Sequence, residues 1–101
     1  MEGRSFGLTH TRHAQKAALE DRYGRVTLPA VLTIGKGEIV EAEVTNGFLT
    51  KLVVRQSLDL KRDAIYVIIP MGAHATLKTV WCNLKTDKHR TLKRHLYAKA
   101  A

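Results

Sequence analysis

The dipeptide Asn46-Gly47 separates two runs of alternating apolar and polar residues, and it constrains the fold more than any other feature of this sequence. This dipeptide between alternating runs is typical of a tight β-hairpin turn, because both residues tolerate positive φ. With Thr45, Asn46 and Gly47 in the loop, Glu41 lies opposite Lys51 on one face and apolar partners meet on the other. The sequence therefore predicts an antiparallel hairpin within residues 38–57.

Two further stretches carry strand patterns. Residues 64–69 are apolar without interruption, which favours a strand buried on both faces at the centre of a sheet. Residues 79–84 alternate, so that Val80 and Cys82 face one side while Trp81 faces the other. We expect four mostly consecutive antiparallel strands.

Two short helices are predicted before these strands. Thr9 or Thr11 is a suitable cap for a first helix over 13–23, which ends at a glycine. A second helix is expected over 28–34, with a proline in its first turn, where the missing amide has no helical partner.

A chain of 101 residues fits one domain with one core. The predicted fold class is α+β, with two short N-terminal helices packed on one face of a four-stranded antiparallel sheet. Residues 1–8 are expected to form a flexible arm. Residues 85–101 are expected to form a basic tail that closes as a short helix or remains a loop.

The charge of the chain points to polyanionic partners. Lys and Arg number 17 against 9 Asp and Glu, which gives a net charge of +8. This excess favours RNA or DNA, and an acidic host protein is the other class of partner that it suits. The cations are most concentrated in the tail, where they oppose only Asp87: Lys85, Lys88, Arg90, Lys93, Arg94 and Lys99.

Six residues are candidates for contacts with nucleic acid. Trp81 could stack a base, or it could anchor the core, and the alternation of its strand leaves both interpretations open. Arg55 could contact a phosphate from the sheet, whereas Lys51 is better explained by an ion pair with Glu41. The remaining candidates are in the tail: Lys88, Arg90, Lys93 and Arg94.

Cleavage of RNA without a metal needs an acid, a base and cations for the phosphorane charge. His13 and His89 are candidates for proton exchange, with Arg62 holding the phosphate and Asn83 as a hydrogen-bonding neighbour. His89 lies between Lys88 and Arg90, and such cations lower the pKa of a histidine. The alternative is that both histidines are solvated polar residues without a catalytic role.

No metal site and no cofactor is predicted, because neither zinc-ligand spacing nor a phosphate-binding glycine loop is present. The single cysteine, Cys82, excludes an internal disulfide and is expected to be a buried thiol. No apolar run approaches the roughly 20 residues of a membrane span. A cytoplasmic protein without a membrane partner and with an open oligomeric state is the expectation.

The order of a histidine-bearing helix and antiparallel strands, with basic and polar residues at the end of the last strand, resembles the fold of barnase, colicin D and RelE-type ribonuclease toxins. The resemblance implies that functional positions of these toxins correspond to residues on the first helix, on the sheet strands and beyond the last strand of this chain: His13, Arg55, Arg62, Thr79, Asn83 and His89. The stretch "VWCNLKTDKHRTLKRHLY" also looks like the end of small uncharacterised phage and mobile-element proteins.

The sequence thus predicts a small basic nucleic-acid-binding protein, with metal-independent ribonuclease activity of the toxin type as its sharpest version. The alternative is a non-catalytic phage or mobile-element effector that binds and inhibits a host protein. Fold alone does not separate these functions.

Overall fold

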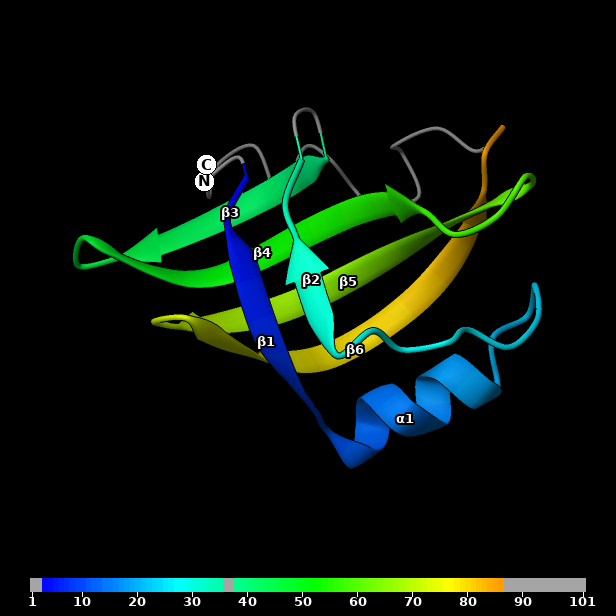
Figure 1. Cartoon of the computed structure of the whole chain (residues 1–101), viewed down its shortest axis with the longest axis horizontal. Coiled ribbons are helices and arrows are strands. Elements are labelled where there is room, and N and C mark those ends of the chain that lie inside the picture. Colours follow the sequence, from blue (N-terminus) through cyan, green and yellow to red (C-terminus); the bar gives the residue numbers. More distant parts are fainter. Residues whose placement is uncertain (1–2, 36–37, 87–101) are drawn as a thin grey trace.

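The computed structural model describes residues 3–35 and 38–86, which form one six-stranded sheet and one helix (Figure 1). The sheet order is β2-β1-β6-β5-β4-β3. The predicted fold class is wrong: the described chain is mostly sheet, with a single short helix instead of two and a mixed sheet instead of an antiparallel one. In chain order, the elements are β1 Ser5–His10, α1 Arg12–Leu19, β2 Val31–Thr33, β3 Ile39–Thr45, β4 Phe48–Ser57, β5 Arg62–Met71 and β6 His74–Leu84.

The predicted hairpin is present between β3 and β4, but its register differs from the expected one. Asn46 and Gly47 have φ values of 52° and 79°, so they alone form the loop and Thr45 pairs with Phe48. A register shift between Glu43 and Val44 then places Glu43 opposite Lys51. The expected pairing of Glu41 with Lys51 therefore exists as a side-chain ion pair of 3.4 Å and not as a directly opposed pair.

The second helix expected over 28–34 is instead the strand β2 with its flanking residues. Exposure alternates here, because Leu32 and Ile34 are buried while Val31 and Thr33 are exposed. β-branched residues with a period of two fit a pleated strand better than a helix. β2 pairs with β1 in antiparallel orientation, which satisfies the backbone that a short helix would have bonded internally.

The expected N-terminal arm also contributes to the sheet. β1 lies between β2 and β6, and it runs parallel to β6. Its Phe6 is fully buried. Residues 3–8 of the expected arm are therefore ordered into the fold, and residues 1–2 lie outside the described part of the chain.

The helix α1 is shorter than expected. Thr11 is its N-cap, and its hydroxyl accepts a hydrogen bond from the Ala14 amide at 3.0 Å. The helix ends at Leu19, where the Glu20 amide still bonds to the Lys16 carbonyl. Its buried residues, Ala14 and Ala18, are small, so the helix lies close to the sheet.

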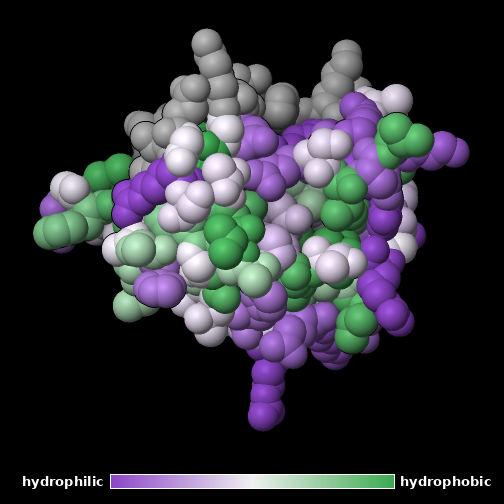
Figure 2. Space-filling view, in the orientation of Figure 1, coloured by the Kyte–Doolittle hydropathy of each residue, from purple (hydrophilic) through white to green (hydrophobic). Residues whose placement is uncertain are grey.

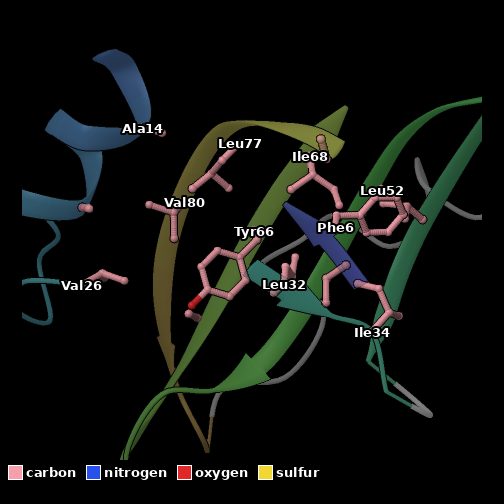
Figure 3. Close-up of a cluster of buried hydrophobic side chains, with 14 of the residues drawn as sticks. Phe6, Ala14, Val26, Leu32, Ile34, Leu52, Tyr66, Ile68, Leu77 and Val80 are labelled. Atoms are coloured by element: carbon pink, nitrogen blue, oxygen red, sulfur yellow. The ribbon is translucent and has the colours of Figure 1, made fainter. Parts of the chain in front are cut away.

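The main core lies on the face of the curled sheet that α1 covers (Figures 1 and 3). Large side chains from five strands and the segment after β2 converge there: Phe6, Leu32, Ile34, Leu52, Tyr66, Ile68, Leu77 and Val80. A second, smaller cluster contains Val53 and Ile65 with Val40, Val67 and Trp81 packed against them. β5 is thus buried on both faces, as its apolar run predicts. Within residues 3–35 and 38–86, no helix is long and apolar enough to cross a membrane.

Candidate functional site

A groove of about 440 Å³ lies beside the end of α1, the turn that follows it, and β6. Its lining comes from all three segments: Ala17, Glu20, Asp21, Arg22, Val80, Trp81 and Cys82. Thr11 fixes the start of α1 on β6, because its amide donates to the Leu77 carbonyl at 3.2 Å and its hydroxyl to the Lys78 carbonyl at 3.1 Å. The helix and the strand therefore form a fixed frame around the groove.

Asp21 fastens the other end of this frame. Its Oδ1 accepts a hydrogen bond from the Cys82 amide at 2.9 Å, and its Oδ2 accepts one from the Tyr23 amide at 3.0 Å. One carboxylate thus closes the turn after α1 and binds the backbone of β6. Burial, and then the charge of Asp21, raises the pKa of the Cys82 thiol to about 11. The thiol is therefore protonated at neutral pH and is a poor nucleophile.

Trp81 belongs to both the groove and the second apolar cluster. Its side chain is partly buried, and it packs against the cluster of Val53 and Ile65 while also lining the groove. The two interpretations of Trp81, as a core anchor and as an exposed platform, therefore apply to different parts of one side chain.

Arg22 lines this groove together with the carboxylates of Glu20 and Asp21. Further cations are exposed on the two elements that form it, Arg12 and Lys16 on α1 and Lys78 on β6 beside the helix N-cap, and His13 is also exposed on α1. Arg22 lies over the ring of its neighbour Tyr23, with 4.6 Å between the guanidinium carbon and the ring centroid. Figure 2 shows hydrophilic side chains projecting along the lower and right-hand edges of the molecule, where α1 lies in Figure 1.

We call the surface formed by these cations and the groove the helix–strand surface. Its residues are Arg12, His13, Lys16, Glu20, Asp21, Arg22, Lys78 and Trp81. Within residues 3–35 and 38–86, Arg12, Lys16 and Lys78 form no salt bridge, so their charges are not offset by a bonded carboxylate.

Arg62, predicted to hold a phosphate, contacts a loop of its own chain. Its Nε donates to Asp59 Oδ2 at 2.7 Å, and its Nη1 lies 3.0–3.2 Å from the carbonyl oxygens of Tyr23, Gly24 and Arg25. The hydrogen bond from Arg62 lowers the pKa of Asp59. These contacts connect the β4–β5 loop with the loop between α1 and β2.

Arg55, predicted to contact nucleic acid, is part of an ion-pair network on the sheet. Its Nε donates to Asp63 Oδ2 at 2.8 Å, and Lys85 Nζ lies 2.7 Å from Asp63 Oδ1. Burial acts to raise the pKa of Asp63, but the hydrogen bonds from Lys85 and Arg55 outweigh it and lower this pKa. Arg55 also donates to the Leu84 carbonyl, so it ties three strands together.

The predicted catalytic residues do not converge within the described chain. His13 is exposed on α1, whereas Asn83 is only 1% exposed and alternates with the inward-facing Cys82 in β6. Arg62 begins β5 and reaches the loop after α1. The remaining predicted residues lie outside the described residues: His89, Lys88, Arg90, Lys93 and Arg94.

Sequence reasoning missed the turn formed by Glu20, Asp21 and Arg22, because it assigned these residues to the first helix. The available signal was Asp21 itself. An aspartate that accepts the amide two residues later ends a helix and begins a turn. The bond from Asp21 to Cys82 spans 61 positions and has no local sequence signal.

Comparison of the chain with protein-family models, curated proteins and solved structures finds no match. Among the residues that the structure describes, no group of three or more His, Cys, Asp or Glu side chains is placed to hold a metal ion. The functional argument therefore depends on the geometry and charge of the helix–strand surface.

Proposed function

We propose that this protein binds nucleic acid through the helix–strand surface. The observation that carries the proposal is the position of the only tryptophan of the chain, Trp81, in a groove whose flanking elements expose cations that form no salt bridge within residues 3–35 and 38–86. Cations of this kind can exchange their counterions for phosphates, and an aromatic side chain among them gives a base a surface to stack on.

The charges of this surface give a quantitative expectation. Arg12, Lys16, Arg22 and Lys78 together can neutralise about four phosphates, so log K should fall with log salt with a slope of about −3 on a single strand. The carboxylates of Asp21 and Glu20 lie on the same surface and oppose this attraction, so four cations face two anions there.

The proposal is for binding without cleavage. Of the predicted catalytic residues within residues 3–35 and 38–86, Arg62 is held by its loop contacts and Asn83 is buried, so only His13 is exposed on the helix–strand surface.

Two double variants with the same change in net charge test the proposal. Lys16→Glu with Lys78→Glu alters the helix–strand surface, whereas Arg25→Glu with Lys61→Glu alters exposed cations elsewhere. Fluorescence anisotropy with labelled RNA and DNA, repeated at several salt concentrations, measures each affinity. We expect the first variant to lose at least about 10-fold in affinity and to have a shallower salt slope, with a much smaller effect in the second. Equal losses in both variants contradict a localised surface.

A protein partner is a second candidate, favoured by one specific observation. Leu60 is 95% exposed, and it lines a second groove of about 480 Å³ with Tyr23 and Leu84. The candidate docking site is the apolar surface that Leu60 forms with Tyr23 and Leu84, since contiguous exposed apolar patches mark interaction sites. Under this alternative Leu60→Asp abolishes the interaction with the host protein, while Lys16→Glu with Lys78→Glu leaves it unchanged.

A further inference from the structure

We infer that the groove of the helix–strand surface takes an unpaired base, so that the ligand is a single strand and not a duplex. This inference rests on the proposed function and specifies its substrate class. It follows from the polar side chains of the groove wall, the support of Trp81 and the space beside it.

The groove lies beside the part of β6 that β1 does not cover. β1 pairs with β6 only as far as Leu77, and β6 continues to Leu84. Asp21 binds the Cys82 amide there, and Val80 and Cys82 are only 2% and 1% exposed, so the backbone of this part of β6 is buried. A ligand in the groove therefore meets the side chains of its wall.

The groove wall carries polar side chains that can contact a base. Glu20 supplies acceptors and Arg22 supplies donors. The Watson–Crick edge of every base carries an adjacent donor and acceptor, so these two side chains can contact an unpaired base of any type. The site therefore recognises a free base edge and has little sequence preference.

Trp81 is placed to stack that base. Its contacts with the second apolar cluster hold the ring, and the part that lines the groove is left for a ligand. The groove volume of about 440 Å³ lies within the range of small-molecule sites, about 300–1,000 Å³. A base inside a duplex is already stacked and paired, so it could enter this groove only after being flipped out.

Two exposed cations lie on the elements that form the groove. Lys78 lies three positions before Trp81 on β6, and Lys16 is exposed on the helix that forms the opposite wall. Phosphates on either side of the stacked base can therefore meet a cation while the base occupies the groove.

The experiment uses the full-length chain, an unlabelled 12-nucleotide strand and the duplex of the same sequence, with affinity measured by competition against a labelled strand. Trp81 is the only tryptophan, so its emission reports the groove directly. We expect the single strand to quench Trp81 and to bind at least about 10-fold more tightly than the duplex. Trp81→Ala should weaken strand binding about 5- to 150-fold, and it should change duplex binding less than 2-fold.

A strand with abasic sites separates stacking from a folding defect. Removing the bases keeps the phosphates, so the abasic strand should bind the wild-type chain as weakly as Trp81→Ala binds the normal strand. Combining both changes should cost little more than either alone. Trp81→Phe, which keeps an aromatic ring, should retain most of the affinity, and circular dichroism checks that each variant is folded.

Three outcomes overturn the inference. Equal binding of strand and duplex with no effect of Trp81→Ala leaves the proposed function intact but removes the base site. Quenching of Trp81 by an unstructured peptide, and by neither nucleic acid, favours a peptide as the ligand of the groove. Failure of both nucleic acids to bind at any salt concentration refutes the proposed function itself.

Discussion

Replacing Asp21 by alanine should loosen the groove and destabilise the fold, because this one carboxylate accepts two backbone hydrogen bonds. A hydrogen bond to a charged group contributes about 1.5–3 kcal/mol when it is buried, and less at a partly exposed site such as this one. With about 1 kcal/mol for each bond, Asp21→Ala should lower the free energy of unfolding by about 2 kcal/mol. For a domain of this size, that corresponds to a fall in Tm of about 8–16 °C.

Urea unfolding measures this effect, and two variants calibrate it. Asp21→Asn keeps one oxygen acceptor and should lose about half as much stability. Glu20→Ala removes the neighbouring exposed carboxylate and should change stability by less than about 0.5 kcal/mol. Hydrogen exchange of the Cys82 amide should accelerate in Asp21→Ala. Unchanged stability together with unchanged exchange at Cys82 would refute the assignment of Asp21 as the link between the turn and β6.

Three further predictions follow from individual contacts. The pKa of Cys82 is about 11 in the folded chain and about 9 in the unfolded chain. The contribution of the protonated thiol to stability is therefore complete below pH 9 and is lost as the pH rises through 11. Over this range, denaturant titrations should show a larger loss of stability for wild type than for Cys82→Ala. Gly24→Ala should lower the free energy of unfolding in urea by about 1–2 kcal/mol, since φ of Gly24 is +107° and the new Cβ would lie 3.2 Å from Arg62 Nη1. In Gly72→Ala the new Cβ meets no neighbour, so this variant should lose less stability. Equal losses in the two variants would contradict a steric contribution at Gly24. Glu41 is only 4% exposed, and its Oε2 has no hydrogen-bond donor within the described ranges. Glu41→Leu should therefore change the free energy of unfolding by less than about 1 kcal/mol. Lys51→Met removes the cation from the buried Glu41 carboxylate and should lower the free energy of unfolding by more than this.

The strands that sequence reasoning predicted are those specified by neighbouring residues. Asn46 and Gly47 define a turn locally, and the apolar run in β5 needs no partner to be recognised. The place of β1 beside β6 could not be predicted, because this parallel pairing joins Gly7 to His74 across most of the described chain. The segment around β2 was assigned to a helix because its proline fits a helical first turn, although its exposure alternates with the period of a strand.

The candidate site was predictable only in its residue types. Trp81 and the general excess of cations were identified from the sequence, but ionic partners were not. Arg55 was taken as a phosphate ligand, because its partner Asp63 lies on the adjacent strand and is identified only once the register is known. For Arg62 the partner Asp59 lies three positions earlier, and this local signal was missed.

The central claim is that nucleic acid binds on the helix–strand surface, and a nitrogen-15 NMR titration of the full-length chain with a 12-nucleotide single strand tests it most directly. The account predicts that the largest shifts fall on residues 12–22 of α1 and its turn and on residues 78–82 of β6, including the indole N–H of Trp81. Shifts centred on the β3–β4 hairpin, or an unchanged spectrum at saturating strand, would contradict it.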